Sequence, residues 1–138
     1  MLRVENLTVK FPSRFGDVTA VENMAMAIAP GEIHGLVGES GAGKSTVGAA
    51  IIGLLQPPGF VADGTLQLGD VDLRALDRFE AHALRGKRVS MIFQDPQTSL
   101  NPLMRIEDQL VETILAHEDI SADAAQSSAI DLLEEMGI

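Results

Sequence analysis

The sequence predicts an α/β fold in which an antiparallel β region comes first and helices dominate the end of the chain. Three observations predict it. Apolar residues nearly alternate over residues 2–11, as in a strand with one exposed face. A short apolar run at residues 33–37 leads through a glycine-rich stretch into an amphipathic helix pattern, and two further helix patterns occupy residues 106–138.

Composition excludes several classes of protein. The 138 residues are 46% hydrophobic, which is too apolar for a disordered chain, and their number suits one globular domain. The absence of cysteine excludes a disulfide scaffold, a thiolate metal site and a cysteine nucleophile. No apolar run approaches the roughly 20 residues that cross a bilayer, and residues 1–11 lack a signal-peptide pattern, so we expect a cytoplasmic protein.

Negative charge is concentrated at the end of the chain. The whole chain has a formal charge of −10, and residues 106–138 contain nine acidic side chains but no lysine or arginine. Such a segment repels nucleic-acid phosphates, so we expect no nucleic-acid partner. A solvated helix face explains the acidic run most simply, and a specific basic partner is the alternative.

The first part of the chain predicts two antiparallel strands. Apolar residues at positions 2, 4, 7, 9 and 11 slip once near Asn6, which predicts an edge-type strand with a bulge. After a turn-rich stretch, residues 18–29 predict the second strand, which Pro30-Gly31 ends.

The middle of the chain predicts a strand, a loop and a helix. Residues 33–37 predict a short, mostly apolar strand, and residues 44–55 predict a helix that residues 56–59 end. The apolar stripe of this helix consists of Val47, Ala50, Ile51, Leu54 and Leu55.

Further elements follow in order. We expect a strand at residues 65–68, a helix at 73–84, a buried-type strand at 89–93 and a proline-containing loop up to residue 102. The next helix carries Ile106, Leu110, Ile114 and Leu115 on one side. The last helix begins after the N-cap Ser121, has Asp123 in its first turn and stops at Gly137. Its apolar side comprises Ala125, Ala129, Leu132, Leu133 and Met136.

The loop before the first helix carries a phosphate-binding motif. The segment Gly38-Glu39-Ser40-Gly41-Ala42-Gly43-Lys44-Ser45 matches G-x-x-x-x-G-K-[ST] at every fixed position, between a predicted strand and helix. Glycines let backbone N–H groups converge, with the helix N-terminus, on a polyphosphate. Lys44 would reach the β and γ phosphates, Ser45 would ligate Mg²⁺ and Thr46 would bind the α phosphate. The motif therefore predicts a nucleoside triphosphate with Mg²⁺, and a glycine-rich turn with an ordinary surface lysine is the alternative.

A second segment selects among phosphate-loop proteins. Residues 90–102, which read SMIFQDPQTSLNP, resemble the Q-loop region of ABC transporter ATPases, most closely the oligopeptide, dipeptide and nickel importer branch. Residues 18–23 and 31–33 also resemble the strands and turn before the P-loop in this family, so the resemblance spans essentially the whole chain. It implies a P-loop NTPase core with an N-terminal antiparallel β subdomain, truncated within the helical subdomain. The corresponding parts are residues 1–35, 36–105 and 106–138.

The resemblance also implies ATP as the nucleotide and roles for particular residues. Gln94 takes the position of the family glutamine, whose amide oxygen meets Mg²⁺ or the attacking water and whose loop moves against a partner. An aromatic residue of the first strands stacks on adenine, which implies Phe11, or alternatively Phe15. A core phenylalanine is the competing interpretation. His34 has no companion motif, and we expect a core or interface residue.

An importer subunit of this family has membrane partners. The resemblance implies peripheral attachment to the cytoplasmic face of the membrane, with transmembrane permease subunits contacting the Q-loop and the helices after it. It also implies pairing with a second ATP-binding subunit, identical or related. The importer would use ATP hydrolysis to take up peptides or nickel.

Some family motifs do not occur in this sequence. The signature, the Asp-Glu strand end and the switch histidine follow the Q-loop in the family, and none is found here. We therefore expect an N-terminal fragment with no catalytic residue of its own and poor stability, whose full-length form is an ATPase. The alternatives are an ABC module of DNA repair or translation and a small P-loop kinase, whose arginine-rich lid is not found in residues 106–138.

Overall fold

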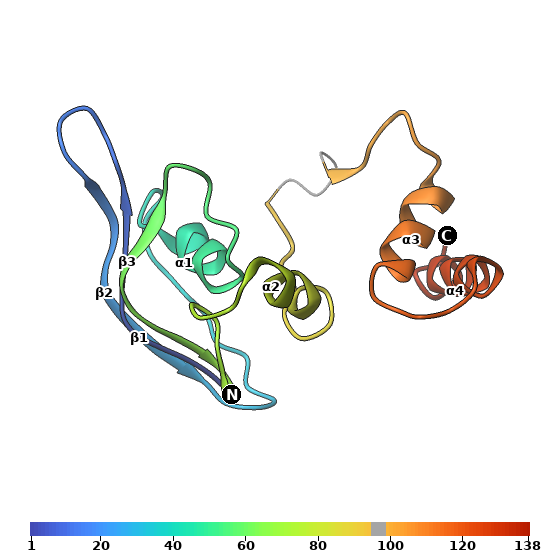
Figure 1. Cartoon of the computed structure of the whole chain (residues 1–138), viewed down its shortest axis with the longest axis horizontal. Coiled ribbons are helices and arrows are strands. Elements are labelled where there is room, and N and C mark those ends of the chain that lie inside the picture. The colour runs from blue at the N-terminus through green and yellow to red at the C-terminus, as the bar shows by residue number, and fades with distance from the viewer. Residues whose placement is uncertain (95–98) are drawn as a thin grey trace. The chain divides into compact units, whose positions relative to one another are not determined.

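A computed structural model of the chain describes residues 1–94 and 99–138. These residues form two compact units, Met1–Arg85 and Gly86–Ile138 (Figure 1). Within the described ranges, no helix combines the length and apolar character needed to cross a membrane.

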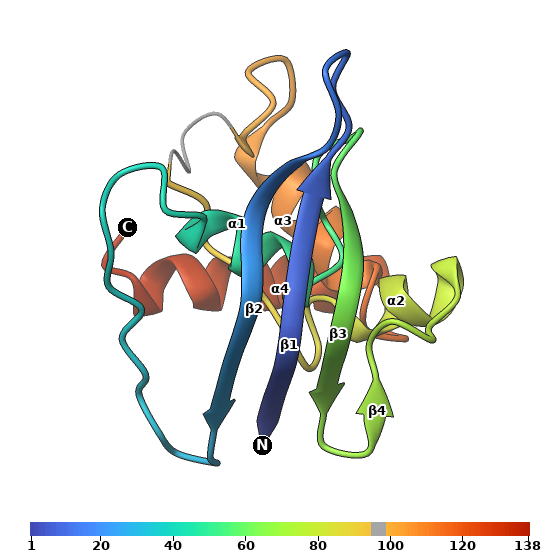
Figure 2. The same ribbon diagram turned by 90° about the vertical axis from the view of Figure 1, so that its left-hand side faces the viewer.

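The first unit is built on an antiparallel sheet with the strand order β2-β1-β3-β4 (Figure 2). The strands are β1 (Leu2–Phe11), β2 (Val18–Ile28), β3 (Phe60–Leu68) and β4 (Val71–Asp72). The two N-terminal strands are confirmed, and β3 begins earlier than predicted. The prediction of an edge strand is wrong, because β1 pairs with β2 on one side and with β3 on the other. Alternation of apolar and polar residues indicates that one face of a strand is exposed. It does not indicate whether the strand has one neighbouring strand or two.

The predicted bulge lies at Asn6, which has a φ of 52°. The register of β1 shifts there against both neighbouring strands. The extra residue turns Leu7 to the same face as Val4 and Val9, although the spacing from Val4 to Leu7 does not follow a period of two. The bulge thus places three fully buried side chains on one face of β1.

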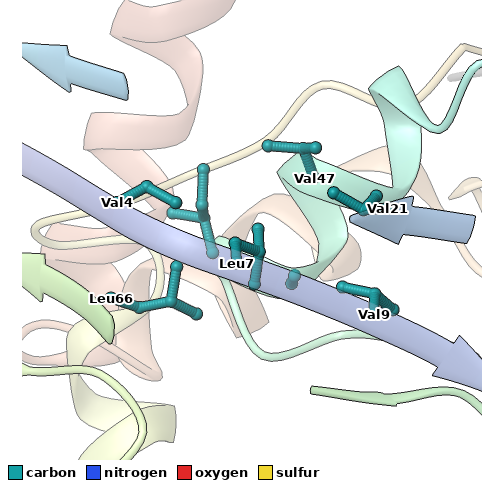
Figure 3. Close-up of a cluster of buried hydrophobic side chains, with 8 residues drawn as sticks. Val4, Leu7, Val9, Val21, Val47 and Leu66 are labelled. Carbon is teal, nitrogen blue, oxygen red and sulfur yellow. The ribbon is translucent and has the colours of Figure 1, made fainter. Parts of the chain in front are cut away.

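A helix covers this face of the sheet. Helix α1 (Lys44–Ile51) buries Val47, Ala50 and Ile51 against the strands, and Val47 lies beside Val21 of β2 (Figure 3). Burial of each large apolar side chain contributes about 1.5–3 kcal/mol. The opposite face of β1 carries the exposed Arg3 and Glu5. The P-loop helix is therefore fixed by its own packing.

Helix α1 is shorter than the predicted helix 44–55. It ends at Ile51, and Gly53 adopts a φ of 66°, which a helix cannot continue through. Of the expected stripe, Leu54 lies beyond the helix and is 39% exposed, whereas Leu55 still packs on the core.

Helix α2 (Arg78–Leu84) also begins later than predicted, because the chain makes β4 and a turn first. Asp77 sets its start. The Asp77 carboxylate accepts the Phe79 and Glu80 N–H groups at 2.7 and 2.8 Å, and the Glu80 carboxylate accepts the Asp77 N–H at 2.9 Å. This reciprocal capping box ends any continuation toward Leu73.

Two predicted strands are not formed. Residues 33–37 have no strand structure, and Ile33 and Val37 are 99% and 93% exposed. Residues 90–93 likewise have none, and Ile92 is 89% exposed. A strand requires a neighbour that takes its backbone N–H and C=O groups, and neither run is paired with a strand among residues 1–94 and 99–138.

The second unit contains the helix pair α3 (Ile106–Leu115) and α4 (Ala122–Glu135), as predicted. The Ser121 hydroxyl accepts the Ala124 N–H at 3.2 Å, and the helix stops before Gly137. Ala125 and Ala129 are buried, which confirms part of the predicted apolar side. The rest of that side is less buried than expected, since Leu132 and Met136 are 46% and 72% exposed.

Candidate functional site

The glycine-rich loop of residues 38–43 ends at the N-terminus of α1. Gly43 is the N-cap of this helix and has a φ of 81°, and Gly41 has a φ of 84°. Left-handed glycines are typical of loops in which successive backbone N–H groups turn to one side and form an anion-binding concavity.

The start of α1 lacks the groups that usually satisfy a helix N-terminus. It has no side-chain cap and no acidic residue in its first turn. The first N–H groups of a helix have no partner within the helix and carry a partial positive charge. The end of α1 that faces the loop therefore favours an anion.

Lys44 brings a full positive charge to this loop. Its ammonium donates to the carbonyl oxygen of Gly38 at 2.8 Å and to that of Glu39 at 2.6 Å. The side chain thus folds back over the loop, which a turn closes through the Ala42 N–H and the Glu39 carbonyl at 3.2 Å. An ammonium held by neutral carbonyls keeps its charge available to an anion.

The loop rests directly on strand β2. A Cβ atom at Gly43 would lie 2.5 Å from the carbonyl oxygen of Ala20 and 3.0 Å from Val21 Cγ2, so no side chain fits there. A cavity of about 250 Å³ lies beside this contact. Its walls are formed by Ala20, Val21, Glu22, Met24, Leu36, Val37, Ala42, Lys44 and Val47.

The other predicted ligands of the loop occupy the first turn of α1. Ser45 is exposed and Thr46 is half-buried, whereas Val47 is buried in the core. The structure therefore brings together the loop from Gly38 to Gly43, the Lys44 ammonium and two hydroxyls at one helix end. The set has the donors that a polyphosphate requires and an accessible hydroxyl of the type that ligates Mg²⁺.

Gln94 belongs to the second unit and its side chain is exposed. The rest of the predicted Q-loop core, Asp95, Pro96, Gln97 and Thr98, lies outside the described residues. The loop that follows is held by Gln109, whose side-chain oxygen accepts the Asn101 N–H at 2.9 Å. The role of Gln94 stays a prediction.

The two candidate aromatic residues occupy different environments. Phe11 packs partly on the core, and its ring lies so close to Gly59 that a Cβ atom there would be 2.5 Å from Phe11 Cε1. Phe15, in the turn after β1, is fully exposed. The sequence alone does not identify Gly59 as a neighbour of Phe11 or Ala20 as a neighbour of Gly43. No local sequence pattern predicts a contact between segments that are distant along the chain.

His34 is exposed, so it is not a core residue, and the alternative, an interface residue, stays a prediction. It lies within residues 33–37, which form no strand, and its Nδ1 is 3.5 Å from the Glu32 carboxylate. The Ala29 N–H donates to the same carboxylate at 2.7 Å. This backbone hydrogen bond and, secondarily, His34 lower the pKa of Glu32.

The family model and the similar proteins of known function indicate the same family for this chain. Residues 21–138 match the family model described as ABC transporter. The chain is 41% identical over 139 residues to the oligopeptide transport ATP-binding protein OppD of Bacillus subtilis, covering 100% of this chain and 39% of that protein. It is 39% identical over 138 residues to the dipeptide transport ATP-binding protein DppD of Escherichia coli, covering 100% of this chain and 42% of that protein. The chain thus spans about two fifths of the length of these curated relatives.

Solved structures agree on the fold. The dimeric structure of MJ0796, a bacterial ABC transporter cassette, matches with a TM-score of 0.81 at 23% identity, over 97% of this chain and 56% of that one. A post-hydrolysis state of MJ0796 bound to ADP and Pi matches with a TM-score of 0.79 at 22% identity, with the same coverage. At these identities the likeness concerns the fold.

Proposed function

Because this chain belongs to the ABC transporter family, we propose that it is the N-terminal part of the ATP-binding subunit of a peptide importer. One observation supports the proposal: left-handed glycines, an uncapped helix N-terminus and the Lys44 ammonium lie together on the glycine-rich loop. The similarity to oligopeptide and dipeptide transport proteins supports the class of transported solute. Nickel, the other solute of the branch, has no such support among these relatives.

Each part of the loop has a distinct task in this proposal. The backbone N–H groups from Gly38 to Gly43 and the first turn of α1 hold the phosphates without a change in protonation. Lys44 exchanges its two carbonyl partners for the β and γ phosphates. This exchange is favourable because hydrogen bonds from an ammonium to charged phosphates are stronger than those to neutral carbonyl groups. Thr46 binds the α phosphate, and Ser45 offers its hydroxyl to Mg²⁺ together with Gln94. When bound, Mg²⁺ neutralises phosphate charge and orients the triphosphate.

The proposed adenine platform is Phe11. The Gly59 backbone and the core contact its ring on one side and fix the position of the ring by apolar packing. A phenyl ring stacks on a base without reading its edge, so the platform supplies affinity and selects weakly between purines. Phe15 is the alternative.

ATP hydrolysis and transport are proposed for the full-length protein. It would attach to the cytoplasmic face of the membrane through permease subunits, with contacts from the Q-loop and from α3 and α4, and it would pair with a second ATP-binding subunit. The residues after Gln94 offer no replacement for the family's catalytic carboxylate, so residues 1–138 by themselves would bind Mg-ATP weakly and turn over negligibly. The three parts of the chain would be the β region 1–35, the core 36–105 and the start of the helical subdomain 106–138.

A non-transport ABC module of DNA repair or translation is the second candidate. The acidic charge of residues 106–138 disfavours direct nucleic-acid contact, and the transport relatives cover the whole chain. We therefore retain the importer as the proposal.

Binding of a fluorescent ATP analogue to the full-length protein tests the nucleotide site. We expect Lys44→Ala to weaken binding by at least about a hundredfold, because the variant loses the charge that faces the β and γ phosphates. Lys87→Ala removes another lysine, which is exposed and outside the loop, and should leave the affinity unchanged. Equal affinities of Lys44→Ala and the wild type would refute the proposed site.

A further inference from the structure

Arg85 joins the ends of two helices. Its guanidinium Nε donates to the carbonyl oxygen of Ile52 at 2.8 Å, and its Nη2 donates to that of Gly53 at 2.9 Å. Its backbone N–H donates to the Ala81 carbonyl at 3.3 Å, where it forms the C-cap of α2. One residue therefore ends α2 with its main chain and caps α1 with its side chain.

The chemistry of this contact favours arginine. The two acceptors are the C-cap Ile52 of α1 and the following Gly53. They lie at the C-terminal end of the helix, which carries a partial negative charge. A guanidinium presents several N–H donors in a planar fork, so it reaches both carbonyls at once, whereas an ammonium is a single point donor. The Arg85 side chain is half-buried, which limits screening by water.

The contact holds α2 rather than α1. Helix α1 buries Val47, Ala50 and Ile51 in the core and is fixed by its own packing. Helix α2 has no buried residue, so hydrogen bonds must provide more of its attachment. Arg85 is also the last residue of the first unit. Its side chain thus fixes, on the P-loop helix, the point from which the chain continues to Gln94.

We propose that Arg85 is a positioning residue that ties the segment leading to Gln94 to the C-terminal end of the P-loop helix. The inference rests on the proposed function, because it assigns Arg85 to nucleotide-dependent turnover. It assigns Arg85 no contact with the nucleotide. Loss of the guanidinium would leave the phosphate loop intact and release the start of the segment that carries Gln94.

The test measures affinity and turnover separately in the full-length protein. We expect Arg85→Gln to keep the affinity for Mg-ATP, measured by calorimetry, within about twofold of the wild type. Its ATP turnover at saturating nucleotide should fall about tenfold, the order expected for the loss of a charge-assisted hydrogen bond. Arg88→Gln removes an exposed arginine nearby and should change neither quantity.

A double-mutant cycle with Gln94→Ala identifies the path of the effect. If Arg85 acts through Gln94, Arg85→Gln lowers turnover by less than about twofold in the Gln94→Ala background. Additive losses would overturn the proposal. So would unchanged turnover of Arg85→Gln, or a loss of affinity as large as the loss of turnover, which would indicate general support of the fold.

A second variant, Arg85→Lys, tests the proposal if Arg85→Gln folds poorly. Arg85→Lys keeps the cation without the fork, and we expect unchanged affinity with a turnover about threefold lower. Wild-type turnover, or reduced affinity, in this variant would overturn the proposal. Failure of the wild-type full-length protein to bind Mg-ATP would refute the proposed function itself, whereas normal binding with normal turnover in the Arg85 variants would refute only the role of Arg85.

Discussion

Single residues shape the proposed nucleotide site mainly through the space they leave for others. Gly59 has no side chain, and the ring of Phe11 fills the space where its Cβ would lie. The backbone at Gly59 is not in the left-handed region, so an alanine there meets the ring without backbone strain. A Cβ atom at Gly59 would also lie 3.0 Å from the Gln56 carbonyl oxygen, but its closest contacts, at 2.5 and 2.8 Å, are with the Phe11 ring. A substitution at this position therefore acts mainly on Phe11.

We predict that Gly59→Ala weakens binding of ATP to the full-length protein about tenfold, because the displaced ring no longer stacks well on adenine. Binding of inorganic tripolyphosphate should be unchanged, since the P-loop does not involve Gly59. Titration calorimetry with both ligands measures the difference. Phe11→Ala should reproduce this selectivity.

Phe15→Ala is the matched control for the aromatic platform. Its ring is fully exposed, and its removal should leave the affinity for both ligands unchanged. A selective loss of ATP binding in Phe15→Ala with normal binding in Phe11→Ala would assign the platform to Phe15.

At the scale of secondary-structure elements, the α3–α4 pair depends on two small residues. Ala125 and Ala129 lie one turn apart on α4 and are buried, at 0% and 2% exposure. Small side chains at such positions let two helices approach closely, and a larger one must displace the partner helix. The amphipathic pattern predicted the buried positions, although not that larger apolar neighbours such as Leu132 remain exposed.

We predict that Ala125→Leu destabilises the helix pair by about 1–3 kcal/mol through overpacking. Hydrogen exchange of the α3 and α4 amides in the full-length protein measures this loss locally. Ala124→Leu makes the same change at an exposed position of the same helix and should leave exchange unchanged. Equal protection in the two variants would show that the α4 face is not packed as described.

The elements that the sequence predicts well are those with local determinants. The helix start after the glycine-rich loop, the Ser121 N-cap and the bulge at Asn6 depend on residues within a few positions, and the structure has all three features. The local pattern does not predict the position of β1 between two strands, because pairing with β3 involves a segment fifty or more residues away. The start of α2 was missed because the Asp77 capping box competes with a longer apolar pattern.

At the scale of the whole molecule, two apolar runs belong to no sheet within residues 1–94 and 99–138. Residues 33–37 precede the P-loop and residues 89–93 precede Gln94, and both have the composition of buried strands. Exposed side chains such as Ile33, Val37 and Ile92 are costly to leave in water and invite association. In the proposed full-length subunit, these runs would become strands of a parallel sheet, which needs neighbours supplied by more distant sequence.

This interpretation predicts a difference in hydrogen exchange between two polypeptides. In the full-length protein, the amides of residues 33–37 and 89–93 should be protected by about a hundredfold or more, because paired strands open only in subglobal events. In a polypeptide of residues 1–138 the same amides should exchange nearly as fast as in an unfolded chain. The amides of β1, paired on both sides, are the internal control and should be protected in both. Fast exchange of residues 33–37 in the full-length protein would mean that the P-loop is not anchored by a strand, and the assignment of this chain's core to a parallel sheet would fail with it.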